Sequence, residues 1–255
     1  MSLVEALTGL DTLARRLRRD CPWDREQSAR TIVPHTIEEA YEVADAALAD
    51  DDAKLLDELG DLLYQVYFLA LLLEEQGHGD LEQVARAIHA KLVRRHPHVF
   101  GDEEITSAGA VRSRWEQVKR EQEGREGIFH DVPETLPALL DARKVQRRAA
   151  AVGFEYPDVD GALADLDDEL RELRQELMSG TDERRSEELG DLLFACVNVA
   201  RRIGADPELE LRRSTRRFRA RVETAERLAE AAGETWVELP LAEQDSYFDR
   251  AKEAE

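Results

Sequence analysis

The sequence is poor in cysteine and in long hydrophobic runs. Its two cysteines, Cys21 and Cys196, lie far apart, and neither belongs to a CxxC pair. This predicts neither a disulfide framework nor a cysteine zinc site, and it favours a reducing cytoplasm as the location. The longest apolar run, LLYQVYFLALLL, is too short to span a bilayer and is typical of a buried helix. The first ten residues, MSLVEALTGL, lack the basic, apolar and small-residue sections of a signal peptide. We therefore expect no membrane partner.

Positive charge is also in deficit. Lys and Arg total 35 against 56 Asp and Glu, which gives a formal charge of −21 and a pI near 4.8. Such a charge repels a phosphate backbone, so no nucleic-acid partner is expected. Apolar residues nevertheless make up 42% of the 255 residues, which is enough to bury the core of one large domain or of two ordinary domains.

Helical periodicity runs along most of the chain. Apolar residues recur at spacings of three and four, and no stretch alternates convincingly as a strand, so we predict an all-α fold. Segments such as CPWD, RRHPHVFGDEEITSAG, GFEYPD and GADPE separate the runs. The longest Gly- and Pro-bearing connection predicts an N-terminal domain at 1–123, a linker at 124–137 and a C-terminal domain at 138–255. The predicted helical runs are Leu3–Leu17, Ile37–Leu48, Leu55–Leu73, Leu81–Val93, Leu136–Val152, Leu163–Leu177, Leu189–Ile203 and Val222–Leu228.

The two predicted domains resemble each other. The string ELGDLL occurs at residues 58–63 and again at 188–193, an offset of 130 residues. Because this period is much longer than a solenoid repeat, it predicts two tandem copies of a helical domain. The same offset aligns Glu39 with Glu169, Glu42 with Glu172, Lys54 with Arg184, and Glu38 with the shorter Asp168.

Acidic residues of the first copy converge beside an apolar helix face. Glu38, Glu39 and Glu42 are spaced by three and four residues and so share one face of a helix. Glu58 and Asp61 border the apolar stripe of the next helix. One such helix is more often a solvated acidic surface, but two convergent helices repeated in a second copy favour a functional site.

Carboxylates held this close together favour protonation unless a cation neutralises them. All-oxygen ligands, without cysteine or the ExxH pair of a di-iron bundle, are typical of Mg²⁺, with Mn²⁺ as a substitute. Because Mg²⁺ leaves positions for water and phosphate oxygens, the pattern predicts a phosphate ester or anhydride as the substrate.

Basic residues occur at helical spacing near these acids. Lys54 precedes the first ELGDLL string by one turn. Lys91 and Arg95 form an i,i+4 pair, as do Arg217 and Arg221 in the second copy. On helices that face the acids, these groups would bind phosphate oxygens, and ordinary surface ion pairs are the alternative.

Eight sequence strings match a known family. CPWDREQ, EEAYEV, DELGDLLYQV and KLVRRHPHVF resemble, in this order, the first half of the MazG family of nucleoside triphosphate pyrophosphohydrolases. GFEYPD, DDELREL, EELGDLLFACVNVAR and RRFRARVE are similar to its second half, so the resemblance covers nearly the whole chain. It implies an α-helical fold of two MazG domains and a homodimer whose four-helix-bundle sites are completed across subunits. It also implies Mg²⁺ dependence and hydrolysis of NTPs and dNTPs to monophosphate and pyrophosphate.

Carried over by position, the resemblance implies one set of site residues in each copy. The implied catalytic and metal-binding carboxylates are Glu38, Glu39, Glu42, Glu58 and Asp61 in the first copy, and Asp168, Glu169, Glu172, Glu188 and Asp191 in the second. The implied phosphate contacts are Lys54, Lys91 and Arg95, and correspondingly Arg184, Arg217 and Arg221.

Aromatic residues are candidates for contact with a nucleobase. Trp115 either stacks on the base or covers the edge of a helix. The resemblance implies an aromatic facing the base near the C-terminus, where Phe248 or Tyr247 stands in place of the more common tryptophan. This departure, and Asp168 in place of Glu, predict weaker base selectivity or metal geometry in the second copy. In similar two-domain members, however, the second copy is the one most associated with activity.

The predicted mechanism is an in-line attack on the α-phosphorus by a water that a metal ion and a glutamate activate. Two alternatives stay open. A narrower pyrophosphatase for dUTP, a damaged nucleotide or an alarmone needs the same acids. A non-catalytic helical assembly protein would use them only to bind Mg²⁺.

Overall fold

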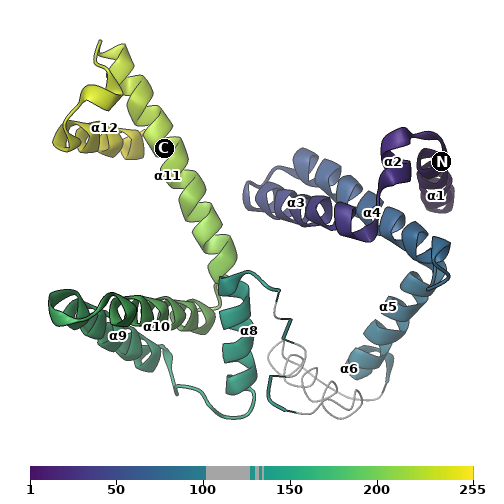
Figure 1. Ribbon diagram of the computed structural model, residues 1–255, viewed down its shortest axis with the longest axis horizontal. Helices are drawn as coiled ribbons and strands as arrows, with labels where there is room; N and C mark the ends of the chain where they lie inside the picture. The colour runs from purple at the N-terminus through teal and green to yellow at the C-terminus, as the bar shows by residue number, and fades with distance from the viewer. Residues whose placement is uncertain (102–126, 130–131, 134, 255) are drawn as a thin grey trace. The chain divides into compact units, whose positions relative to one another are not determined.

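Helices form every regular element of the described chain. The computed structural model describes residues 1–101, 127–129, 132–133 and 135–254, and these ranges contain no strand. The predicted all-α fold is therefore confirmed. The chain divides into two compact units, Met1–Glu123 and Gly124–Glu255 (Figure 1). The linker at 124–137, and the interpretation of the second unit as a copy of the first, stay predictions.

The first unit contains an antiparallel pair of long helices, α3 and α4. The turn between them is tight: Asp50 has a φ of 53°, a left-handed conformation that Asp tolerates. Asp51 then caps α4, because its side chain accepts a hydrogen bond from the backbone N–H of Lys54 at 3.0 Å. The helices of this unit are α1 (Leu3–Asp20), α2 (Pro22–Glu26), α3 (Ala29–Leu48), α4 (Asp52–Glu75), α5 (Leu81–Arg95) and α6 (Pro97–Phe100).

The core of the first unit lies between the start of α3 and the second half of α4. Ile32 of α3 packs with Phe68 and Leu72 of α4, and Tyr64 and Leu69 surround them. Because the helices are antiparallel, this register leaves the acidic residues of both helices at the opposite end of the pair, beside the turn.

The second unit contains a corresponding antiparallel pair, α9 and α10. α8 packs on α10, and α12 folds back on the long α11. Ala225 and Ala229 of α11 allow close approach of α12, where they pack with Tyr247 and Ala251. The helices are α8 (Ala138–Ala150), α9 (Val159–Ser179), α10 (Asp182–Arg202), α11 (Pro207–Ala231), the 3-10 turn η1 (Trp236–Glu238) and α12 (Leu241–Glu253).

Several helix boundaries predicted from periodicity were wrong, most of them at prolines. Pro22, Pro97 and Pro207 lie in the first turns of α2, α6 and α11, although their segments were predicted as breaks. Because the first N–H groups of a helix need no helical partner, proline can begin a helix as well as end one. α11 thus starts well before the predicted Val222. α3 also starts earlier than predicted, at a capping box formed by Ser28, and α12 was not predicted as a helix.

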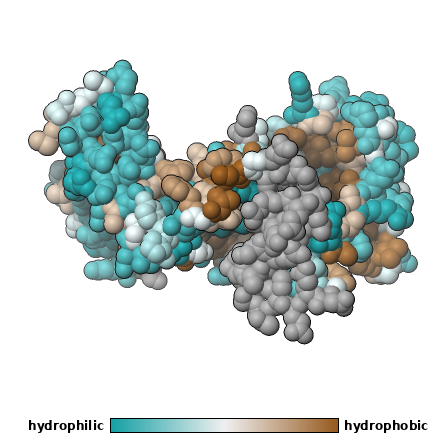
Figure 2. All heavy atoms as spheres, turned by 90° about the horizontal axis from the view of Figure 1, so that it is seen from below, coloured by the Kyte–Doolittle hydropathy of each residue, from teal (hydrophilic) through white to brown (hydrophobic). Residues whose placement is uncertain are grey.

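Large apolar side chains remain exposed on both helix pairs. Leu59 of α4 and Leu189 of α10 occupy the same place in the repeat, and each is 48% exposed. Leu63 and Leu193, one turn later, are exposed as well. Figure 2 shows such hydrophobic side chains at the surface among hydrophilic ones. Within the described part of the chain, no helix is both long and apolar enough to cross a membrane.

Candidate active site

The first candidate site lies between α3 and α4, near the turn that joins them. The register that packs Ile32 against Phe68 also brings Glu39 of α3 to Glu58 and Asp61 of α4. One carboxylate oxygen from each of these three residues lies within 4.8 Å of the others. Glu58 is buried, Glu39 is half-buried and Asp61 is exposed, so the group can be reached from solvent.

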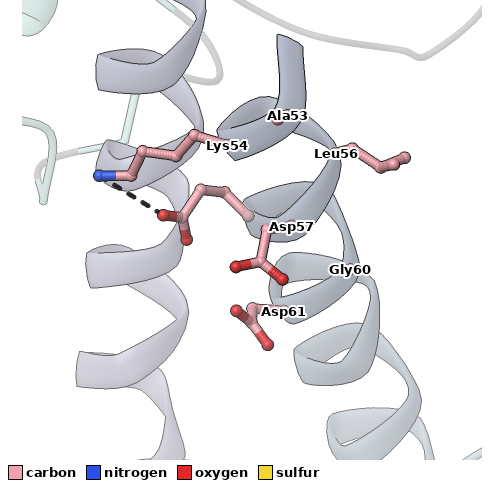
Figure 3. Close-up of a pocket in the computed structure, with 7 residues that line it drawn as sticks. Ala53, Lys54, Leu56, Asp57, Gly60 and Asp61 are labelled. Atoms are coloured by element: carbon pink, nitrogen blue, oxygen red, sulfur yellow. Dashed lines mark ion pairs between the residues drawn. The ribbon is translucent and has the colours of Figure 1, made fainter. Parts of the chain in front are cut away.

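An open pocket of about 690 Å³ lies over the start of α4 beside this group. Lys54 lines it, and its Nζ lies 3.7 Å from Oε1 of Glu58, the ion pair drawn in Figure 3. Asp57 also lines the pocket on the same face as Asp61 (Figure 3), although the sequence analysis did not identify it. Its spacing of one helical turn from Asp61 was the available signal. The pocket therefore presents several carboxylates and one ammonium group to an entering ligand.

Burial and mutual repulsion raise the pKa of two carboxyl groups here. For Glu39 burial has the largest effect, and the charges of Asp61 and Glu42 raise the pKa further. Burial also has the largest effect on the pKa of Glu58. The charge of Glu42 raises this pKa further, and the charge of Lys54 lowers it. The cluster thus carries more negative charge than its own cation compensates. An all-oxygen donor set with this excess charge fits a hard divalent cation such as Mg²⁺ or Mn²⁺.

The second unit contains a similar group. Glu169 and Glu172 of α9 and Glu188 of α10 each place one carboxylate oxygen within 4.8 Å of the others. Burial raises the pKa of Glu169 most, and the charges of Asp191 and Glu172 add to the effect. Arg184, one turn before Glu188 on α10, forms an ion pair with it. Each unit therefore combines three clustered carboxylates with a cation one helical turn away.

The first acidic position of each repeat lies outside these groups. Oε2 of Glu38 lies 3.7 Å from Nδ1 of His35, and its side chain is exposed. Asp168, which aligns with Glu38, is exposed and forms an ion pair with Arg171. Asp168, which stands where the family resemblance implies Glu, is therefore not one of the three clustered carboxylates of the second unit. Metal contacts from these two residues stay predictions.

The other predicted contacts lie on α5, α11 and α12, and neither group of three carboxylates includes them. Of the two C-terminal aromatics, Tyr247 is buried and donates a hydrogen bond to Glu234 at 3.0 Å. Phe248 is partly exposed, and its ring centroid lies 5.7 Å from that of Phe218. Trp115 lies outside the described residues. The contacts that stay predictions are those of Lys91 and Arg95 on α5, Arg217 and Arg221 on α11, and Phe248 on α12.

Comparison with known proteins shows which family the chain resembles along most of its length. A family model described as the MazG nucleotide pyrophosphohydrolase domain matches residues 27–100, which contain the whole first carboxylate group. A nucleoside triphosphate pyrophosphohydrolase of Escherichia coli (strain K12) is 40% identical over 254 residues, 96% of each chain. A nucleoside triphosphate pyrophosphohydrolase/pyrophosphatase MazG of Thermotoga maritima is 39% identical over 235 residues, 91% of this chain and 89% of its own. The crystal structure of a mazG-related protein from Thermotoga maritima covers 45% of this chain and 99% of its own, with 30% identity and a TM-score of 0.40.

Proposed function

The chain belongs to the MazG family of nucleotide pyrophosphohydrolases, and we propose that it hydrolyses nucleoside triphosphates, NTPs and dNTPs alike, to monophosphate and pyrophosphate in a Mg²⁺-dependent reaction. The observation that carries this proposal is the clustering of carboxylates from two antiparallel helices beside a cation, once in each unit. Such a site suits a divalent ion and a polyphosphate bound together. Mn²⁺ is expected to substitute for Mg²⁺, and the proposed location is the cytoplasm.

The clustered carboxylates are the proposed metal ligands. Glu39, Glu58 and Asp61 would hold the ion in the first unit, and Glu169, Glu172 and Glu188 in the second. The ion, when bound, neutralises phosphate charge and lowers the pKa of an attacking water. Glu42 and Asp191 are close enough to these groups for their charges to act on them. The charge of Glu42 raises the pKa of Glu58, and that of Asp191 raises the pKa of Glu169. They are the proposed additional ligands or proton acceptors.

The chain's own groups would position the phosphates and move the proton. Lys54 and Arg184 stand beside the clusters, where their charges can pair with phosphate oxygens as negative charge shifts during the reaction. A carboxylate of the cluster takes the proton of the water as its oxygen attacks the α-phosphorus. The bond from this phosphorus to the bridging oxygen breaks, and that oxygen leaves with the electron pair as part of pyrophosphate.

A homodimer is part of the proposal. Each helix pair leaves apolar residues such as Leu59 and Leu189 half exposed at the same place in the repeat. Two helices cannot cover such faces alone, whereas two pairs can form a four-helix bundle. A second copy of the chain supplies the missing pair with matching chemistry. The four-helix sites expected from the family would then be completed across subunits.

A nucleotide panel tests the proposed function. Purified protein is incubated with Mg²⁺ and each of eight common ribo- and deoxyribonucleoside triphosphates, and released pyrophosphate is measured. A protein carrying both Glu58→Gln and Glu188→Gln serves as the background control. We expect turnover of several nucleotides. One strongly preferred base would favour the narrower pyrophosphatase, and no pyrophosphate from any nucleotide would favour the assembly protein.

A further inference from the structure

Arg184 binds two neighbouring carboxylates of α10 at once. Its Nη1 donates to Oε2 of Glu187 at 2.6 Å, and its Nη2 donates to Oε1 of Glu188. Arginine suits such a bridge, because its planar group carries several donors in fixed directions. The side chain of Glu188 is only 4% exposed, whereas those of Arg184 and Glu187 are 52% and 60% exposed. A surface cation therefore neutralises a buried carboxylate of the second group.

The contact with Arg184 limits what Glu188 can offer to a metal ion. A carboxylate has two oxygens, and Arg184 binds one of them. Arg184 and a metal ion also repel each other and compete for the same negative charge. The ion pair must therefore open before Glu188 can bind a metal ion with full affinity. Opening leaves Arg184 with a partner, because Glu187 stays beside it.

The first unit has a simpler contact at the equivalent position. Lys54, which aligns with Arg184, forms one ion pair among the described residues, with Nζ 3.7 Å from Oε1 of Glu58 (Figure 3). Asp57 aligns with Glu187, is one methylene group shorter and forms no ion pair with Lys54 in the described structure. The buried glutamate of the first unit is therefore held by a single ammonium group that bridges no second carboxylate.

The two carboxylate groups also differ in their members. Asp61 belongs to the group of the first unit, but Asp191, which aligns with it, lies outside that of the second, where Glu172 takes the third place. Both aspartates are exposed and lie one turn after the buried glutamate, so position on the helix does not account for the difference. The bridge from Arg184 to Glu188 thus accompanies a different metal-free arrangement of the second group.

A triphosphate can open the pair between Arg184 and Glu188. A guanidinium group binds phosphate oxygens with the same geometry as carboxylate oxygens, and a triphosphate brings several negative charges. When Arg184 turns to a phosphate, Glu188 loses its counterion and becomes available to a metal ion that the phosphates carry. Each negative group keeps a cation throughout this exchange.

We propose that Arg184 is an internal counterion that occupies Glu188 until a triphosphate displaces it, so that the second unit takes up Mg²⁺ together with the triphosphate. This inference rests on the proposed function. The first unit, in which Lys54 makes a single contact, binds Mg²⁺ alone more tightly. Arg184 thereby links the uptake of metal in the second unit to the arrival of substrate.

The first test measures metal binding in one unit at a time. Of the two carboxylate groups, Glu58→Gln leaves the second complete and Glu188→Gln leaves the first complete. Isothermal titration with Mg²⁺ alone should show at least tenfold tighter binding to Glu188→Gln than to Glu58→Gln. Adding Arg184→Gln to Glu58→Gln should tighten Mg²⁺ binding at least tenfold, because the competing cation is gone. Arg185→Gln is the matched control: it removes a neighbouring cation that pairs with Asp182, and it should change the affinity less than twofold.

The second titration uses the premixed complex of Mg²⁺ with diimidotriphosphate, a non-hydrolysable triphosphate that has no base. In the Glu58→Gln protein, Arg184→Gln should weaken binding of this complex at least tenfold, because the phosphates lose a cation. The same substitution thus acts in opposite directions on the two probes, which a loss of packing cannot do. Lys54→Arg with Asp57→Glu, made in the Glu188→Gln protein, transfers the bridge to the first unit and should weaken binding of Mg²⁺ alone at least threefold.

Three results would overturn the inference. Weaker binding of Mg²⁺ alone in Arg184→Gln would mean that the guanidinium group orients Glu188 as a ligand. An equal gain in Arg185→Gln would mean that only the general charge of the surface matters. Changes of the same sign for both probes would mean that Arg184 has a structural role.

Melting curves establish that each variant is folded. If Arg184→Gln is not, Arg184→Lys decides: with the single contact of the first unit, it should bind Mg²⁺ alone at least threefold more tightly, and an unchanged affinity contradicts the inference. If the parent releases no pyrophosphate while the two probes respond in opposite directions, the proposed function fails alone. Normal turnover with unchanged Mg²⁺ affinity in Arg184→Gln refutes only this inference.

Discussion

Glu188→Gln tests the second carboxylate group directly, because glutamine keeps the shape of the side chain and removes one negative charge. Without metal, the variant loses the ion pair with Arg184, which is exposed and still pairs with Glu187. Glu188 itself is buried, but the exposed Arg184 keeps a partner, so losing this pair leaves no buried charge without compensation. The variant also loses repulsion from Glu169, which is about 0.9 kcal/mol for unit charges 4.8 Å apart in bulk water. We therefore expect the metal-free free energy of unfolding to change by less than about 1 kcal/mol, in either direction.

The response to Mg²⁺ should change much more. An ion that binds only the folded protein stabilises it in proportion to the logarithm of its affinity. A tenfold loss of affinity at saturating Mg²⁺ removes about 1.4 kcal/mol of that stabilisation. For a chain of this size, the midpoint of thermal unfolding then rises with Mg²⁺ by about 3–6 °C less than in the parent. Removing one carboxylate of three should cost at least this much.

Melting curves with and without Mg²⁺, run beside the pyrophosphate assay, measure both effects. Glu58→Gln makes the same change in the first unit. Turnover should fall at least 100-fold in the variant of the working unit, and we expect the larger fall from Glu188→Gln because the resemblance favours the second copy. Glu187→Gln is the matched control, since Glu187 lies 2.6 Å from Arg184 but does not belong to the carboxylate group.

The reasoning is refuted if Glu58→Gln and Glu188→Gln both behave like Glu187→Gln. Full activity and an unchanged Mg²⁺ response in both would mean that the clustered carboxylates are solvated surface groups. A large loss of metal-free stability in either variant would also contradict the electrostatic argument, because the carboxylate would then be a structural partner.

Three further predictions concern the phosphates, the assembly and pH. Lys91→Ala combined with Arg95→Ala should raise KM at least tenfold with little change in the melting temperature, and an unchanged KM would exclude the predicted phosphate contacts. Light scattering should give twice the 28.9 kDa of one chain, whereas a stable, active monomer at micromolar concentration would rule out the dimer. The raised pKa of Glu39 means that its proton favours the folded state, so its stabilising contribution is present at low pH and lost as pH rises above the ordinary value of 4.5. Without metal, the parent should therefore gain stability relative to Glu39→Gln as pH falls from 7.5 to 5, and a difference that is constant with pH would contradict this.

The sequence by itself determined the helical class, the repeat and the types of residue at the site. These features are local: a spacing of three and four residues defines one helix face, whatever that face packs against. Glu39, Glu58 and Asp61 could therefore be identified from their place on two successive helices. Proline was ambiguous at this level, because the same residue ends one helix and begins another. Pro207 and the unpredicted start of α11 show this directly.

Only the tertiary structure decided which carboxylates meet. Glu38 and Glu39 are neighbours in the sequence and both were predicted to bind metal, yet only Glu39 lies within reach of Glu58 and Asp61. Adjacent residues differ by about 100° around a helix, so the rotation and register of α3 against α4 select between them. The contact of Gln146 with Phe194 likewise joins residues 48 positions apart, and no local spacing predicts it. Register between helices depends on how whole apolar faces pack, and that is a property of the folded chain.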